Sequence, residues 1–520
     1  MTVTAPASTP PHQVPAVPGA PWPTAAAAGV LAAAAYALTL STHYSSDGMA
    51  FARLTRAGDL TAPLFFQAEH LLYPFVGWLF TRALALVGLP SDPLLALQLL
   101  NALGGGLAVA AFCWAACRLL PTRLAAGAAT VALAASYGWW YHSSDAEDQI
   151  LANAGLLVAF AALAAGQGSY LRGRWPTGRG WAVVLGLAGA LLVHATTVLF
   201  LPAAALLFWR TARRRETLVL ALLGAVLVGG PYLLIGVGVH HLTTPAAWHS
   251  WLLAAPGHGV WGRLTPRNLW TGLQSLTLAA IALPTAPTLT GLRTLAPAAL
   301  VSSLGVVVMA GGLVAAVIAG LRERDWLARV LLLWAGAFAL FGVYWAPDDF
   351  QFWLLVLPPL YLLIARRLTP RWLWGVVLPL ALWNLGVGIL PRHDPATNRG
   401  LVATRCLAER LAPQDLVVTP GWDWAGDYLP YFTTVKVLSL NDSYVLAARG
   451  DRATFFALLA QQLAETRQAG GRVYLVRLDD LTDAEADFFR RVTGLTAADF
   501  PWARQDAFTC GEVRVREVLP

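Results

Sequence analysis

The first three-quarters of the chain alternates long apolar runs with short polar turns, and the last quarter does not. Several of the runs approach or exceed the roughly 20 residues that an α-helix needs to cross the hydrocarbon core of a bilayer. We therefore predict a polytopic α-helical membrane protein that ends in a soluble region from residue 392 onward. The predicted apolar segments are residues 24–40, 71–89, 94–119, 124–140, 149–165, 181–209, 217–239, 295–321, 326–345, 350–365 and 372–390.

Arginines set the topology of these segments, because short loops rich in Lys and Arg tend to face the cytoplasm. Five basic clusters can all be cytoplasmic only if two conditions hold. Residues 71–89 must not cross the membrane, and residues 181–209 must form two half-spanning helices that turn near His194. The five clusters are Arg118/Arg123, Arg172/Arg174/Arg179, Arg210/Arg213/Arg214/Arg215, Arg322/Arg324/Arg329 and Arg366/Arg367/Arg371.

This solution predicts about eleven crossings in a transmembrane domain of residues 24–391. The N-terminus is expected in the cytoplasm and the C-terminal domain on the other side, in an integral protein of the plasma (inner) membrane. Residues 1–23 are rich in Pro, Ala and Thr and lack Lys and Arg, which predicts a disordered cytoplasmic tail and not a signal peptide. The external loops are then residues 43–93 and 240–293, and the aromatic, proline-punctuated second loop favours short interfacial helices.

Residues 392–520 have a different pattern, in which short apolar runs alternate with amphipathic ones. This order predicts a small extracytoplasmic α/β domain with a partly parallel sheet. No glycine-rich loop follows the first expected strand, which argues against a nucleotide site. The expected strands are residues 415–419, 435–440 and 472–478, and the expected helices are residues 453–467 and 482–491.

Composition supports the membrane assignment. Hydrophobic residues make up 57% of the chain and charged residues 12%, about half the charged fraction of a typical soluble domain. The net charge of +7 does not indicate nucleic-acid binding, because the arginines lie in short loops between helices. Cys113 and Cys117 stand one helical turn apart in a predicted span and are expected to be packing residues. Cys406 and Cys510 could form a disulfide in an oxidising compartment, and their pairing is left open.

Acidic and histidine side chains collect on the predicted external face. The stretch 41–74 carries Asp47 and His70, and a second acidic cluster runs from His142 to Asp148. A solvated loop explains either cluster alone. Two acidic loops that face each other above a membrane bundle, however, form a candidate site.

Each candidate residue has a structural alternative. Asp145 could cap a helix, and Glu147 could stabilise the macrodipole of the helix that follows it. His70 could be an interfacial side chain, and His194 could hydrogen-bond a helix end. The pair at positions 348–349 is expected in an exposed turn.

The order of these features resembles the GT-C glycosyltransferases of the protein O-mannosyltransferase type. The resemblance is carried by an acid in the first loop (Asp47), by the run from His70 to Pro74, by Gln98 and Asn101 in the next helix, and by the Asp145–Asn153 stretch. It implies a GT-C-like fold, with Asp47 as catalytic base and Glu147 or Asp148 supporting the base or the acceptor. It also implies a sugar donor carried on a polyprenyl phosphate.

The residues suit that chemistry. A carboxylate near the interface can act as general base on an acceptor hydroxyl, and fixed cations can neutralise the leaving phosphate. We therefore predict an inverting membrane glycosyltransferase that acts on the extracytoplasmic face, with no cofactor, no metal site and no nucleic-acid partner. The alternative is a lipid or solute transporter without transferase activity. The candidate phosphate-binding residues are Arg53, Arg56, Arg263, Arg267, His70 and His194.

Overall fold

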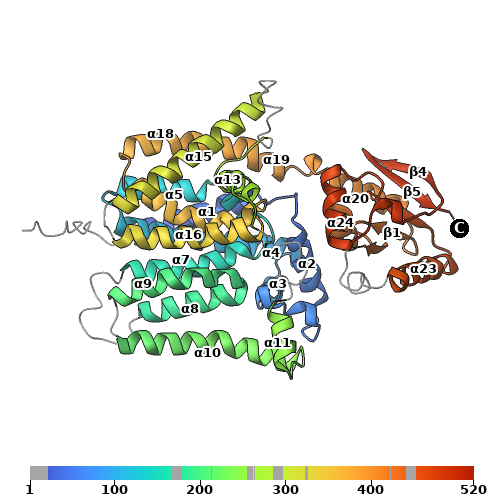
Figure 1. Ribbon diagram of the computed structural model, residues 1–520, viewed down its shortest axis with the longest axis horizontal. Helices are drawn as coiled ribbons and strands as arrows, with labels where there is room; N and C mark the ends of the chain where they lie inside the picture. Colours follow the sequence, from blue (N-terminus) through green and yellow to red (C-terminus); the bar gives the residue numbers. More distant parts are fainter. Residues whose placement is uncertain are drawn as a thin grey trace, which may run out of the picture.

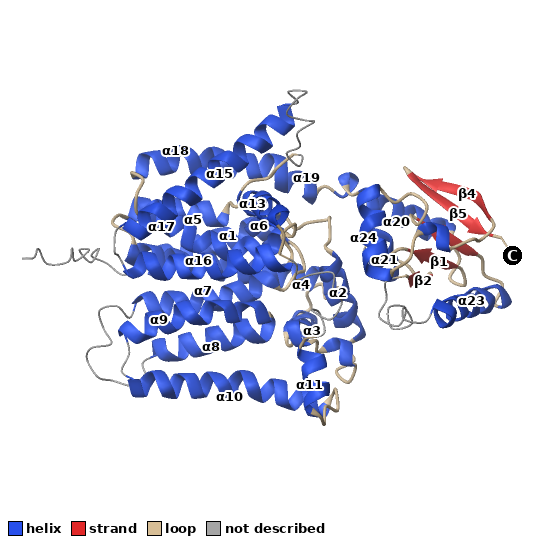
Figure 2. Ribbon diagram, viewed as in Figure 1, coloured by secondary structure: helices blue, strands red, loops and turns tan. Residues whose placement is uncertain are grey.

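The structure is a computed structural model of the whole chain, and it describes residues 22–165, 178–211, 214–253, 262, 264–284, 297–322, 326–421, 423–440 and 452–519. Helices lie side by side in a bundle, and a smaller α/β domain sits beyond one end of it (Figure 1). Figure 2 shows that all the strands belong to this smaller domain. We call the end of the bundle nearest to it the domain-facing end.

Five helices within the described ranges are long and apolar enough to cross a membrane, and a sixth crossing is counted if one bent pair is a single span. The predicted number of about eleven crossings is therefore not confirmed. Other predicted spans are present as apolar helices of 10–17 residues, fewer than the roughly 20 that a full crossing needs. The long helices are α4 (Pro93–Leu119), α10 (Arg214–Gly238), α15 (Pro297–Arg322), α16 (Trp326–Trp345) and the run formed by α18 (Pro370–Trp383), the π-helical turn η7 (Asn384–Ile389) and α19 (Leu390–His393).

The apolar run 124–140 was expected to form one helix, and this expectation is wrong. It forms α5 (Arg123–Ala134) and the separate helix α6 (Tyr137–Ser144). The side-chain amide of Asn384 makes the break possible, because it donates 2.8 Å hydrogen bonds to the carbonyl oxygens of Ala135 and Ala280. A buried carbonyl that leaves a helical ladder needs such a donor.

The sequence also predicted a turn near His194 and a segment at 71–89 that does not cross the membrane. The helix α8 (Gly178–Val193) ends at His194, and the chain continues through the 3-10 helix η5 (Ala195–Phe200) into α9 (Leu201–Thr211), so the expected turn lies where predicted. The helix α3 (Tyr73–Leu86) has 14 residues, or about 21 Å at 1.5 Å per residue, which is too short to cross the hydrocarbon core.

Glycines let neighbouring helices of the bundle approach closely. The helices α7 (Gln149–Ala165) and α8 meet at Gly155 and Gly186, where a Cβ atom on either residue would lie 2.6–2.7 Å from the backbone oxygen of the other. The helix α1 (Trp22–Leu38) packs on α4 in the same way through Gly29 and Gly106. Small residues at such crossings are the usual means of helix association in a membrane, where apolar burial gives little driving force.

The remaining elements of the membrane part lie mostly near the domain-facing end or complete the bundle. The segment 240–293 was expected to hold short interfacial helices. The helix α11 (Pro245–Leu252) is short, as expected. The helix α13 (Pro266–Ala280) instead buries one face against η6 (Phe350–Val356), α6 and α15. These elements are α2 (Ser46–Ala57), η1 (Pro63–Phe65), η2 (Ala68–His70), α11 (Pro245–Leu252), α13 (Pro266–Ala280), η6 (Phe350–Val356), α17 (Leu357–Ala365) and η8 (Pro395–Thr397).

The C-terminal domain is a five-stranded sheet of order β2-β1-β3-β5-β4 with helices packed around it. The first three strands in this order are parallel and the other two are antiparallel, so the predicted partly parallel sheet is confirmed. Three strands and two helices agree with the predicted segments; α20, α21, β4 and β5 were not predicted. The elements are α20 (Arg399–Arg410), β1 (Leu416–Thr419), α21 (Trp424–Phe432), β2 (Lys436–Ser439), α23 (Arg452–Gln468), β3 (Val473–Val476), α24 (Asp483–Thr493), η10 (Ala497–Asp499), β4 (Arg504–Cys510) and β5 (Val513–Val518).

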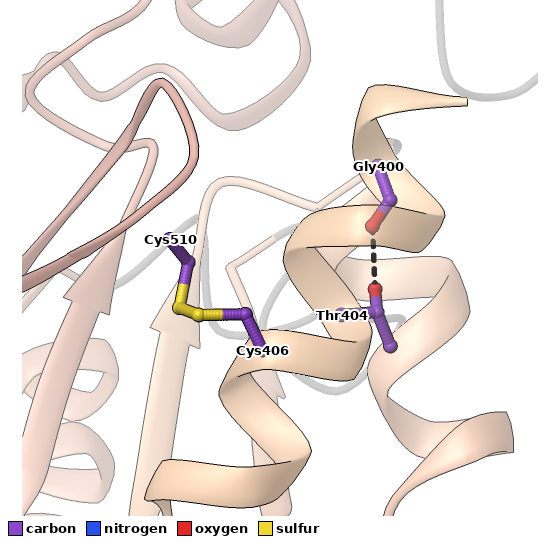
Figure 3. Close-up of a disulfide and its surroundings, with 4 residues drawn as sticks. All are labelled: Gly400, Thr404, Cys406 and Cys510. Atoms are coloured by element: carbon purple, nitrogen blue, oxygen red, sulfur yellow. Dashed lines mark hydrogen bonds between the residues drawn. A yellow bond between two sulfur atoms is a disulfide. The ribbon is translucent and has the colours of Figure 1, made fainter. Parts of the chain in front are cut away.

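A disulfide joins the two ends of this domain. Cys406 on α20 and Cys510 at the end of β4 are bonded, with their Cα atoms 5.7 Å apart and a sequence separation of 104 (Figure 3). Cys113 and Cys117 are free, and Cys113 is buried among the helices, as expected of a packing residue.

The domain is fastened to the bundle through α21. The guanidinium of Arg56 lies 3.4 Å above the ring of Tyr431, and it also donates a 2.7 Å hydrogen bond to the carbonyl oxygen of that residue. The hydroxyl of Tyr431 donates to Asp92, at 3.0 Å, and Tyr428 donates to the carbonyl oxygen of Tyr44, also at 3.0 Å. The first external loop and the C-terminal domain therefore hold each other in place.

Helix packing at Gly186 gives a test of the fold. Substitution Gly186→Val places a branched side chain against the backbone of α7 and forces the two helices apart, so we expect a lower melting temperature and a lower yield of folded protein in detergent. Gly189→Val on the same helix is the control, because a Cβ atom there meets nothing within 4 Å. Equal melting temperatures for the two variants would contradict the close contact.

Candidate active site

Asp47 lies in the first turn of α2, at the domain-facing end. The Ser45 side chain caps this helix by accepting a 3.0 Å hydrogen bond from the backbone N–H of Gly48. Directly after Ser45, the hydroxyl of Ser46 donates to Asp427 of the C-terminal domain. Asp47 is therefore held between the bundle and the domain above it.

The second acidic cluster occupies a sharp elbow between α6 and α7, two helices bent by 116° relative to each other. The elbow, residues 145–148, is held by side chains that donate to its carbonyl oxygens. The amide of Asn101 donates to Asp145, at 2.8 Å, and to Glu147, and the hydroxyl of Tyr73 donates to Ala146, at 2.8 Å.

Gln98 extends this clamp to the first loop. Its amide donates to the carbonyl oxygens of Ser41, at 2.7 Å, and Ser144, at 3.1 Å. The backbone N–H of Ser45 in turn donates to the Asp145 carboxylate at 3.0 Å. The two acidic loops predicted to face each other are thus hydrogen-bonded together.

Two of the elbow carboxylates are paired with histidines. Oε2 of Glu147 lies 2.7 Å from Nδ1 of His142, and both side chains are buried. Oδ2 of Asp148 lies 2.5 Å from Nδ1 of His70. Burial alone would lower the pKa of His70, but the Asp148 charge and hydrogen bond outweigh it and raise that pKa to about 9. The same contact holds the pKa of Asp148 below its usual value although burial opposes it.

His194 has the opposite character. Its Nδ1 accepts a 3.2 Å hydrogen bond from the backbone N–H of Thr196, which requires an unprotonated Nδ1, and its Nε2 lies 2.8 Å from the side-chain amide of Gln149. Burial lowers the pKa of His194 to about 4. The rings of His70 and His194 are 4.9 Å apart, so a cationic and a neutral imidazole stand side by side near neutral pH.

Asp47 has no histidine bonded to it. Its side chain is exposed to solvent, although many protein atoms of the surrounding loops lie near it. Desolvation by these atoms, followed by the negative charge of Glu147, raises the pKa of Asp47 to about 7, while His70 acts in the opposite direction. A carboxyl with such a pKa can accept and release a proton near neutral pH.

Asp349 is a further acid of the site that the sequence analysis placed in an exposed turn. That expectation holds for Asp348, which is exposed, but the carboxyl of Asp349 faces the same cluster. Burial and the charge of Glu147 raise the pKa of Asp349 to about 7. Its Oδ1 also caps η6 by accepting from the backbone N–H of Gln351 at 3.1 Å.

The predicted phosphate-binding arginines lie in different places. Arg53 and Arg56 follow Asp47 on α2, and both donate to backbone carbonyl oxygens of α21, at Gly426 (3.2 Å) and Tyr431 (2.7 Å). Arg267 is exposed at the start of α13, and Arg263 lies outside the described residues.

Arg392 was not predicted as part of the site. It lies in α19, at the end of the last long apolar run, and its guanidinium lies 4.5 Å above the ring of Tyr141 on α6. The charge of Asp145 contributes to its electrostatic environment. The sequence places Arg392 at the end of the last apolar run, on the side of the C-terminal domain, and this position could have indicated a cation of the site.

A cleft of about 950 Å³ opens between the domain-facing end of the bundle and the C-terminal domain. On the bundle side it is lined by the start of α13 and by residues 345–348. On the domain side it is lined by Pro420, Gly421, Asp423, Arg477 and α24.

His70, Asp148 and His194 form a group that could hold a metal ion, since one ligand atom from each lies within 4.8 Å of the others. In the arrangement described, Nδ1 of His70 is engaged by Asp148 and Nδ1 of His194 accepts from Thr196. The remaining nitrogen of His194 contacts Gln149, so metal binding would require these hydrogen bonds to change.

No protein-family model matches the chain, and no curated protein sequence matches it. Solved structures do. ArnT from Cupriavidus metallidurans bound to undecaprenyl phosphate is 14% identical, with a TM-score of 0.57 over 95% of this chain and 97% of that chain. The same protein in the apo state is 15% identical, with a TM-score of 0.58 and the same coverage. The archaeal oligosaccharyltransferase AglB from Archaeoglobus fulgidus, in complex with an inhibitory peptide and a dolichol-phosphate, is 11% identical, with a TM-score of 0.52 over 94% of this chain and 74% of that chain.

Identities this low establish a shared fold and no more. The chain has the polytopic, mostly helical membrane fold of these proteins, with a sheet-containing domain at its C-terminal end. The GT-C resemblance is thereby confirmed at the level of the fold, whereas the protein O-mannosyltransferase type is not confirmed.

The clamp on the elbow gives a test of the site's architecture. Asn101→Asp keeps the shape of the side chain but replaces its donor with an acceptor that faces two carbonyl oxygens. We expect the free energy of unfolding to fall by about 1–3 kcal/mol for each carbonyl left without a donor. This loss should appear as a lower melting temperature in nanodiscs. Leu103→Ala, on the exposed side of the same helix, is the control, and an Asn101→Asp variant as stable as this control would contradict the clamp.

Proposed function

We propose that the protein is a membrane glycosyltransferase that moves a sugar from a polyprenyl-phosphate donor to an acceptor hydroxyl at the domain-facing end of the bundle. The observation that carries the proposal is the convergence of Asp47 and the 145–148 elbow beneath the C-terminal domain, in the fold of a protein whose structure holds undecaprenyl phosphate. The position of the acids in loops at helix ends favours this activity over transport, for which ionisable groups near the membrane midplane are typical.

Asp47 acts as general base in this proposal. The acceptor oxygen attacks the anomeric carbon, its proton passes to the Asp47 carboxylate, and the bond from that carbon to the phosphate oxygen breaks. The electron pair of the broken bond leaves with the polyprenyl phosphate. One displacement of this kind inverts the configuration at the anomeric carbon.

The surrounding charges have separate roles. Glu147 lies close enough to raise the pKa of Asp47 and so strengthens it as a base. Asp148 keeps His70 protonated, which places a cation near the reacting centre for the leaving phosphate. Arg53, Arg56, Arg263 and Arg267 are proposed to assist. His194 is proposed to assist as well, by exchanging the contact of its Nε2 with Gln149 for one with the phosphate. A guanidinium has five N–H groups, so the backbone contacts of Arg53 and Arg56 leave donors for a phosphate.

The disulfide supports the predicted side of the membrane. Bonds such as Cys406–Cys510 form and persist in oxidising compartments and are rare in the cytosol. We therefore place the C-terminal domain and the acidic site outside the cytoplasm, in a protein of the plasma (inner) membrane.

The first prediction from this function concerns Asp47. Substitution Asp47→Asn keeps the size of the side chain but removes the base, and we expect sugar transfer in proteoliposomes to fall about 10²- to 10⁴-fold. Radiolabelled polyprenyl-phosphate sugars with a membrane extract as acceptor provide the assay. Asp59→Asn, an exposed acid of the same loop, is expected to retain full activity. Full activity in Asp47→Asn would remove this residue from its role.

The second prediction concerns pH. Transfer requires Asp47 ionised and His70 protonated, so activity should rise with pH through about 7 and fall above about 9. Glu147→Gln removes a negative charge that raises the pKa of Asp47, so the acid limb of the pH–activity profile should move to lower pH. Asp349 titrates in the same range, and Asp349→Asn should therefore keep an acid limb. Because the charge of Glu147 also raises the pKa of Asp349, the Asp349→Asn variant decides between the two acids. Loss of activity together with the acid limb in Asp349→Asn would assign the base to Asp349 instead.

A further inference from the structure

The cleft lies at the edge of the C-terminal sheet where the order of the strands reverses. The chain passes from β1 to β2 on one side of β1 and then crosses over to β3 on its other side. Parallel sheets bind ligands outside the carboxyl ends of their strands at such a point of reversal. Residues directly after β1 (Pro420 and Gly421) and directly after β3 (Arg477) line the cleft.

Arg477 has an uncommon backbone conformation at this edge. Its φ of 69° lies in the left-handed region, where residues other than glycine are rare. The guanidinium is held by Asp423, with Nε 3.3 Å from a carboxylate oxygen, and by Glu485 at the start of α24. Unusual backbone of this kind gathers at ligand sites, so its position in the cleft points to a binding function.

The opposite wall comes from the membrane part. Thr265, Arg267 and Asn268 at the start of α13 contribute hydroxyl, guanidinium and amide groups. Trp345 and Asp348 contribute an aromatic ring and an exposed carboxylate. A ligand in the cleft is thus contacted by both parts of the protein.

Two short stretches of chain connect the cleft to the proposed catalytic acids. Asp348 lines the cleft, and the next residue, Asp349, belongs to the acidic cluster. Asp423 also lines the cleft and caps α21, and Asp427, four residues or about 6 Å along that helix, bonds to Ser46 beside Asp47. The cleft and the Asp47 loop are therefore connected through about one turn of α21 and the hydrogen bond between Asp427 and Ser46.

The lining groups indicate the kind of ligand. Carboxylates, guanidinium groups, hydroxyls and an amide alternate with aromatic rings, and several of the charges already neutralise one another, as in Asp423–Arg477–Glu485 and Asp487–Arg491. A sugar hydroxyl is both a donor and an acceptor, so a polyhydroxylated chain can bond to groups of either kind. Five lining carboxylates against three arginines disfavour an anionic ligand, and the internal pairing leaves little field to attract a basic peptide.

We propose that this cleft binds a neutral oligosaccharide, the acceptor onto which the sugar is transferred. The ligand class is inferred from the cleft alone. That this ligand is the acceptor rests on the proposed function. The volume of about 950 Å³ is at the upper end of the range for small-ligand sites, which leaves room for several sugar rings.

The test measures binding, not turnover. Fluorescently labelled full-length Asp47→Asn protein in nanodiscs is applied to an array of neutral linear oligosaccharides, uronic-acid and phosphorylated oligosaccharides, and lysine-rich peptides. We expect binding to one or more neutral oligosaccharides, weakened at least tenfold by Trp345→Ala and by Asp348→Asn. The matched controls are Trp270→Ala, an exposed tryptophan of α13 outside the cleft lining, and Glu409→Gln, an exposed acid of α20.

The outcomes separate this inference from the proposed function. Neutral-oligosaccharide binding that the cleft variants weaken upholds the inference even if the transfer assay fails. No binding to the array, a preference for anionic ligands or peptides, or binding that Trp345→Ala and Asp348→Asn leave unchanged overturns it, even if transfer is observed. Because Asp348 is exposed, its substitution is not expected to disturb folding.

Discussion

The arrangement of the site depends on one polar clamp inside an otherwise apolar bundle. Asn101 and Gln98, both on α4, donate to the carbonyl oxygens exposed where α6 turns into α7. Without these donors the elbow would leave unpaired carbonyls in a buried setting, and the backbone could not hold three acids at one turn. Since Gln98 also holds Ser41, the same clamp brings the Asp47 loop to the elbow.

Charge is distributed unevenly around this clamp. Glu147 and Asp148 each have a histidine as a close partner, whereas Asp47 and Asp349 have none bonded to them among the described residues. Burial and the charge of Glu147 raise the pKa of Asp47 and of Asp349 to about 7, and they also raise the pKa of Asp145, to about 6. The contact with His70 thus keeps Asp148 ionised, whereas Asp47 and Asp349 exchange protons near neutral pH.

Sequence patterns predicted the local elements better than the way they join. Hydrophobic runs located α7 and α16 to the residue, and arginine placement predicted the turn at His194. The break between α5 and α6 was missed because Asn384, which supplies its donors, lies about 250 residues further along the chain. Asp349 was assigned to the wrong environment for a similar reason, since its neighbours come from other loops. The strands β4 and β5 carry many polar residues and show little apolar periodicity.

The bond between Cys406 and Cys510 makes the C-terminal domain a closed covalent loop that contains α21, Arg477 and α24. The last residues of the chain are therefore structural, because a protein shortened before position 510 would lose the link as well as β5. Tags and fusion partners are better placed beyond the final strand than within it. The loop also means that proteolytic nicks inside the domain would leave both fragments attached to the membrane.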